Sequence, residues 1–76
     1  MINYMGKAIC KSLEEAERIY LKMKELPDTL VEQDGKVVYV SYCPSEYTSN
    51  KTEQETIVYI KKTLSLVEGH SYFHLF

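Results

Sequence analysis

The sequence TLVEQDGKVVYVSY, residues 29–42, carries the clearest strand signal in the chain. Its second half is rich in β-branched and aromatic residues, which favour strands. Between the two halves, the Asp34-Gly35 pair suits a type I′ turn, because both residue types tolerate positive φ angles. The stretch therefore predicts a β-hairpin, in which Val31 faces Val38.

A helix is predicted before this hairpin, in residues 12–26, SLEEAERIYLKMKEL. Ser12 and Glu15 have the spacing of a capping box, which marks the start of a helix. Pro27 ends the segment, because proline cannot continue a helix. Apolar residues at helical spacing form one face that we expect to pack on the core. They are Leu13, Ala16, Ile19, Tyr20, Met23 and Leu26.

A second helix is predicted after the hairpin. It begins near Thr52, where Thr52 and Glu55 repeat the capping-box spacing. Gly69 is expected to end it in a left-handed conformation, as glycine commonly does at helix C-termini. The apolar stripe of this helix consists of Ile57, Ile60, Leu64 and Val67.

The two ends of the chain supply the remaining strands. Residues 72–76 form the last strand, and the first ten residues form a strand with a candidate bulge at Gly6-Lys7. The weak alternation of this first strand runs through Ile2, Tyr4, Ala8 and Cys10.

The predicted order is thus strand, helix, hairpin, helix, strand. It resembles the βαββαβ arrangement of ferredoxin-like α+β domains, in which a four-stranded antiparallel sheet has both helices on one face. A three-stranded α+β sheet with a loose N-terminus is the alternative. A fold this widespread implies no function by itself.

Length and charge limit the classes of function. The chain has 76 residues, so we expect a single domain over residues 1–76. A formal net charge of −2 and a single arginine, Arg18, provide no basic field for phosphate backbones, which disfavours nucleic acid as a partner. Neither a signal peptide nor a run of about 18 apolar residues is present, so we expect a cytoplasmic protein without a membrane segment.

Cysteine and histidine offer one candidate for catalysis and a weak one for metal binding. Cys10 and Cys43 form no C-x-x-C pair, and their distance from His70 and His74 is too long for a zinc signature, so we expect neither metal nor cofactor. Cys10 lies just before Ser12, however, where a helix N-terminus and nearby lysines lower a thiol pKa. Pairing of the end strands would bring His70 close, which makes a cysteine-dependent enzyme one alternative function.

Strand alternation assigns each side chain to one face of the sheet. The face beneath the helices is expected to hold Val31, Val38, Val40, Tyr42, Phe73 and Leu75, together with Ile2, Tyr4 and Cys10. The other face is expected to expose Met5, Leu30 opposite Tyr39, Val37, Tyr72, His74 and Phe76. Such an apolar face is typical of a binding surface.

The C-terminal sequence HSYFHLF, residues 70–76, contains no acidic residue, lysine or arginine. We expect it to form a sheet edge, and an uncharged aromatic edge favours pairing with another chain. The sequence therefore predicts a homodimer through the C-terminal strand. The alternative is that these aromatic residues are ordinary core.

A non-enzymatic module that binds another protein is the function that the sequence favours. The expected partner-binding residues are Leu30, Val37, Tyr39, Tyr72, His74 and Phe76. Small size and a composition typical of AT-rich genomes suit an accessory protein of a phage or mobile element, such as an inhibitor of a host protein. Single-stranded nucleic-acid binding is the alternative, because this topology can present stacking residues on its central strands, here Tyr39 with Met5 or Tyr4.

Overall fold

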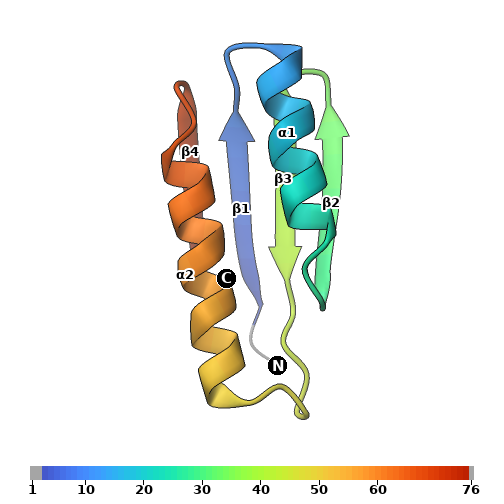
Figure 1. The fold of residues 1–76 in the computed structure, drawn as a ribbon, viewed down its shortest axis with the longest axis vertical. Coiled ribbons are helices and arrows are strands. Elements are labelled where there is room, and N and C mark those ends of the chain that lie inside the picture. Colours follow the sequence, from blue (N-terminus) through green and yellow to red (C-terminus); the bar gives the residue numbers. More distant parts are fainter. Residues whose placement is uncertain (1–2, 76) are drawn as a thin grey trace.

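The computed structural model describes residues 3–75 and confirms the ferredoxin-like α+β fold (Figure 1). Its elements are β1 (Tyr4–Ile9), α1 (Leu13–Lys24), β2 (Thr29–Asp34), β3 (Val37–Tyr42), α2 (Asn50–Ser65) and β4 (His70–Leu75). All strand pairs are antiparallel, in the order β2-β3-β1-β4, so β2 and β4 are the two edges. Neither helix of the described residues is long and apolar enough to cross a membrane.

Both helices lie on one side of the sheet, with α1 on β2 and β3 and α2 on β4 (Figure 1). We call this side of the sheet the covered face. Its strands and the helices above it enclose the core, whose buried apolar residues are Ala8, Cys10, Ala16, Ile19, Met23, Val38, Val40, Tyr42, Ile57, Ile60, Leu64 and Val67. The ring of Tyr4 stacks on Phe73 and closes one end of the core.

The hairpin between β2 and β3 differs from its predicted register. Val31 lies opposite Val40 instead of Val38, and Leu30 lies opposite Ser41 instead of Tyr39. The turn residues are therefore Gly35 and Lys36, and positive φ at Gly35 alone fits a type II′ turn, which has glycine at its first central position. The shift moves each pairing by two residues, so every side chain keeps its predicted face.

Strand β1 has no bulge at Gly6-Lys7, since its register with β3 and β4 is continuous from Tyr4 to Ile9. Gly6 is required for a different reason. A Cβ atom at this position would lie 2.6 Å from Phe73 Cδ1 and 2.8 Å from the Tyr72 carbonyl oxygen. The glycine therefore permits β4 and its Phe73 ring to pack closely on β1.

Helix α1 begins as predicted. Ser12 is its N-cap, and its Oγ accepts a hydrogen bond of 3.1 Å from the Glu15 N–H. The Glu15 carboxylate accepts the Lys11 N–H at 3.0 Å, one residue earlier than in a standard capping box. Leu13 was expected in the core but is 58% exposed, because it lies in the first turn of the helix.

Helix α2 begins earlier than predicted. Ser49, and not Thr52, is its N-cap, and the Ser49 Oγ accepts the Thr52 N–H at 3.1 Å. The prediction was wrong because several hydroxyl residues precede the apolar stripe, and Ser49, three residues before Thr52, is the one that caps. Gly69 is also not left-handed, since positive φ among the described residues occurs only at Asp28 and Gly35. Gly69 instead lies so close to the Ile9 carbonyl that a Cβ atom would overlap it.

Strand β4 is an edge, as predicted, and begins at His70, two residues before its predicted start. Phe73 packs against the core from it. Leu75 was expected beneath the helices but is 59% exposed, because it is the last residue of an edge strand and has a neighbouring strand on one side only. The predictions for Ile2 and Phe76 lie outside the described residues.

Candidate functional site

The side of the sheet opposite the helices has no covering element in the described part of the chain, and we call it the open face. The strand registers arrange its side chains in three rows that cross β2, β3, β1 and β4 in that order. The first row is Leu30, Ser41, Met5 and His74; the middle row is Glu32, Tyr39, Lys7 and Tyr72; the third row is Asp34, Val37, Ile9 and His70.

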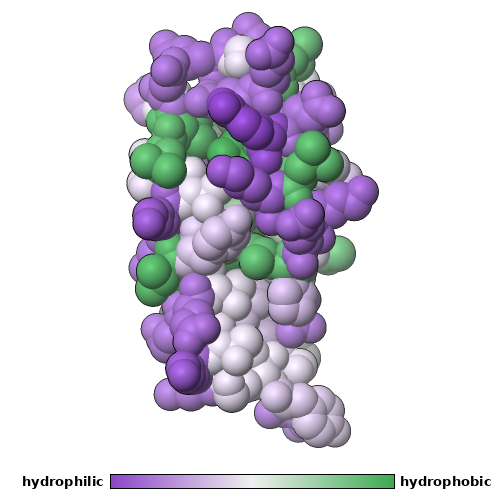
Figure 2. Space-filling view, in the orientation of Figure 1, coloured by the Kyte–Doolittle hydropathy of each residue, from purple (hydrophilic) through white to green (hydrophobic). Residues whose placement is uncertain are grey.

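Large apolar and aromatic side chains on this face meet solvent. Leu30 is 73% exposed, Tyr72 is 52% exposed and Tyr39 is 42% exposed, and Met5 and Ile9 are also exposed. On the helix-bearing side, by contrast, hydrophilic residues are spread over the surface and hydrophobic residues form separate patches (Figure 2). Several large apolar and aromatic side chains exposed on one sheet face mark a site of association.

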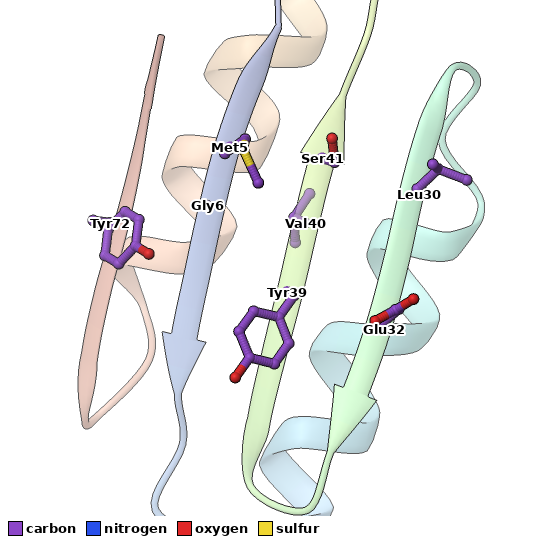
Figure 3. Close-up of a pocket in the computed structure, with 8 residues that line it drawn as sticks. All are labelled: Met5, Gly6, Leu30, Glu32, Tyr39, Val40, Ser41 and Tyr72. Atoms are coloured by element: carbon purple, nitrogen blue, oxygen red, sulfur yellow. The ribbon is translucent and has the colours of Figure 1, made fainter. Parts of the chain in front are cut away.

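The open face contains a hollow of about 330 Å³. It lies over β3, where the short side chain of Ser41 separates Leu30 from Met5. Tyr39 and Glu32 continue its lining, and Tyr72 lies on the β4 side (Figure 3). The hollow is wide enough for one or two side chains of another molecule, and its lining is mainly apolar, so it fits an apolar group better than a charged one.

The charged groups of the open face are few and separated by strand. Lys7 lies at the centre, with its Nζ 5.5 Å from the centroid of the Tyr39 ring, a cation–π geometry. Glu32 and Asp34 both lie on the β2 edge. The face is therefore acidic along one edge and basic near its middle, with tyrosines between and beside these charges.

The β4 edge carries two stacked rings. Tyr72 and His74 have centroids 5.1 Å apart and an interplanar angle of 22°. Both side chains are exposed, and no residue of β4 is acidic or is a lysine or arginine. The edge strand thus presents an aromatic surface together with backbone groups that no other strand pairs.

The structure brings most of the predicted partner-binding residues to one face. Leu30, Val37, Tyr39, Tyr72 and His74 all lie on the open face, although Val37 is only partly exposed. Phe76 lies outside the described residues.

Six members of this face were not identified from the sequence: Lys7, Ile9, Ser41, Glu32, Asp34 and His70. The alternation of Met5, Lys7 and Ile9 carries the signal for two of them. The assumption of a bulge at Gly6-Lys7 concealed it, because a bulge breaks the period of two.

Cys10 and His70 do not form the arrangement expected of a catalytic pair. Cys10 is buried in the core, whereas His70 lies opposite Ile9 on the open face. The pKa of the Cys10 thiol is raised, first by burial and then by the Glu15 carboxylate, with a smaller opposing effect of Arg18. The expected lowering of this pKa is therefore wrong, because burial outweighs the helix N-terminus.

Within residues 3–75, no three His, Cys, Asp or Glu side chains come close enough together to hold a metal ion. Cys10 and Cys43 are both free thiols. Comparison with known proteins finds no match, whether with protein-family models, curated proteins or solved structures. The open face is therefore the candidate functional site.

Proposed function

We propose that this protein is a non-enzymatic module that binds another protein through the open face of its sheet. The observation that supports this proposal is the exposure of Leu30, Tyr39 and Tyr72, with Met5 and Ile9, on one continuous face. Covering that face with a protein surface would remove these apolar groups from water, at a gain of about 25 cal/mol for each Å² buried.

The exposed residue types also suit protein recognition. Tyrosine and methionine are enriched in protein interfaces, and a hollow beside a tyrosine can accept an apolar anchor of the partner. The β4 edge offers a second mode of binding, by addition of a partner strand. The role as an inhibitor of a host protein stays a prediction from size and composition.

Photo-crosslinking tests this proposal. A benzophenone amino acid in place of Tyr39 reports on the open face, and the same group in place of Tyr59 on α2 is the matched control, because Tyr39 is 42% exposed and Tyr59 is 41% exposed. Irradiation in the native cells should give a protein adduct from position 39 and none from position 59. Equal adduct formation at the two positions, or none at position 39, would contradict the proposal.

A single-stranded nucleic-acid binder is the second candidate. Tyr39 and Tyr72 flank Lys7 in the middle row, which is an arrangement suited to stacked bases and a phosphate. Glu32 and Asp34 on the same face and the net charge of −2 oppose phosphate binding. We therefore rank it below protein binding.

A further inference from the structure

We propose that the molecule covering the open face is a second copy of this chain, packed face to face about a two-fold axis that runs along the strands. This inference rests on the proposed function and names its partner. Pairing of two copies through their β4 edges alone would leave Leu30, Tyr39 and Met5 exposed in both copies, whereas face-to-face packing buries them.

Symmetry leaves two simple ways to stack two such sheets with their strands aligned, as packed sheets prefer. When the axis runs along the strands, β2 of one copy lies over β4 of the other, and β3 lies over β1. Each row then lies over the same row of the second copy. When the axis runs across the strands, every strand lies over its own counterpart, and the first row lies over the third.

The charges of the middle row distinguish these arrangements. With the axis across the strands, Glu32 lies over Glu32 of the second copy, and Lys7 lies over Lys7. Like charges buried against each other oppose association strongly. With the axis along the strands, Lys7 lies over Tyr39 of the second copy. Glu32 then lies over its Tyr72, and its Lys7 is offset to the side by one strand spacing of about 4.8 Å.

The axis along the strands therefore gives each Lys7 an aromatic ring and a carboxylate of the other copy. The phenol of Tyr72 offers a hydrogen-bond donor to Glu32 of the second copy. Because the axis is two-fold, each of these contacts occurs twice.

The contacts of the first and third rows also favour the axis along the strands. In the first row, the long side chain of Met5 lies over the short Ser41 of the second copy, at the hollow that Ser41 leaves. In the third row, Ile9 lies over Val37, and Asp34 lies over His70 of the second copy. Ile9 and Val37 thus form an apolar contact, Leu30 lies over His74 of the second copy, and the acidic β2 edge meets the β4 edge, which carries no acidic residue.

The area of the open face limits the expected affinity of the dimer. Four strands of six residues cover about 380 Å² in projection, from a strand spacing of about 4.8 Å and a rise of about 3.3 Å per residue. Standard interfaces bury about 800 Å² on each partner. The open face is smaller than a standard interface, so we expect a weak dimer.

Sedimentation equilibrium on two charge-reversed variants tests this arrangement. Lys7→Glu places a glutamate near Glu32 of the second copy, and Glu32→Lys places a lysine near its Lys7. Each variant alone should dimerise at least about tenfold more weakly than wild type. An equimolar mixture of the two should recover a heterodimer within about threefold of the wild-type affinity, because every opposed pair is then attractive again.

Matched controls carry the same charge changes on exposed helix positions, Lys61→Glu on α2 and Glu17→Lys on α1. They should associate like wild type. Tyr39→Lys is an independent test, because it places a lysine over Lys7 of the second copy and should also weaken dimerisation. Circular dichroism should show that all five variants are folded.

Three results would overturn the inference. Wild type that stays monomeric at about 1 mM excludes a second copy as the occupant. Dimerisation that survives both single charge reversals indicates the axis across the strands or pairing through the β4 edge. If each variant dimerises more weakly but their mixture does not recover the wild-type affinity, Lys7 and Glu32 do not form the paired contacts. An adduct of benzophenone at position 39 with a different protein, with wild type monomeric, would leave the proposed function intact and remove only this partner.

Discussion

Strand β3 presents two different surfaces from alternate residues. Val38, Val40 and Tyr42 are almost completely buried on the covered face, whereas Tyr39 is 42% exposed on the open face. Val37 and Tyr39 on the open face are apolar or aromatic like the buried residues, and only Ser41 is polar. The two sets differ because two helices lie over one face and no element of the described chain lies over the other. Hydrophobicity alone therefore does not locate the core of this domain; the positions of the helices do.

Lysine substitutions at adjacent positions test this contrast most strongly. Val40→Lys places a charge in a site that is 1% exposed and should unfold the domain, at a cost above about 4 kcal/mol. Tyr39→Lys should change the free energy of unfolding by about 1 kcal/mol or less, because its side chain meets solvent. Thermal unfolding followed by circular dichroism compares the two. Similar losses at both positions would mean that the open face belongs to the core.

Glycine substitutions test how tightly the strands beneath the helices are packed. Gly6→Ala should cost about 2 kcal/mol, because its Cβ would meet Phe73 and the Tyr72 carbonyl. Gly35→Ala has no such neighbour but has a φ of 61°, so it should cost about 1 kcal/mol. Urea unfolding of both variants measures the difference, and a Gly6→Ala variant as stable as wild type would show that β4 moves freely on β1.

The pH dependence of the free energy of unfolding tests the burial of the Cys10 thiol on the covered face. Because burial raises its pKa in the folded state, the unfolded chain loses this proton first as the pH rises. Its stabilising contribution is therefore complete below the ordinary thiol pKa of 9.0 and is lost as the pH rises toward the folded-state pKa. Urea unfolding at pH 7.5 and pH 10 should show this loss in wild type and a smaller one in Cys10→Ala. Equal losses would assign the effect to other groups, such as Tyr42, whose pKa burial also raises.

The smallest effect is expected with nucleic acid. Single-stranded DNA or RNA should show no saturable binding below about 10 μM at physiological salt, because the open face has one lysine among two carboxylates. A gel-shift titration checks this expectation. Tighter binding that Tyr39→Ala weakens would reverse the order of the two candidate functions.

Much of the fold could be predicted from local patterns. The hairpin, the stripe of α2 and the Ser12 cap all follow from residue types at fixed spacing, and the order of elements then limits the topology. The register of the hairpin and the ends of the helices and strands were harder to predict. The turn residues at 34–36 allow two registers that differ by two residues, and both keep the same faces, so the hydrophobic pattern cannot separate them.

The candidate site could be predicted only where alternation is unbroken. Tyr39 and Leu30 follow directly from the period of the hairpin strands. Lys7 was not identified, because a glycine inside a strand indicates a bulge as readily as a close contact, and only the position of Phe73 decides between them. Leu75 was placed in the core although its strand was predicted as an edge, because alternation alone does not show that the strand ends at this residue.

Concentration-dependent NMR shifts of the backbone amides give the most direct test that the open face is the binding surface and that a second copy covers it. Spectra of uniformly ¹⁵N-labelled wild type, recorded from about 20 μM to about 1 mM, cover the concentrations at which a weak dimer forms. The shifts should concentrate at open-face positions of β1 and β3, including Lys7 and Tyr39, and should disappear in Lys7→Glu. Shifts confined to α1 and α2, or to β4 alone, would contradict the assignment of the open face.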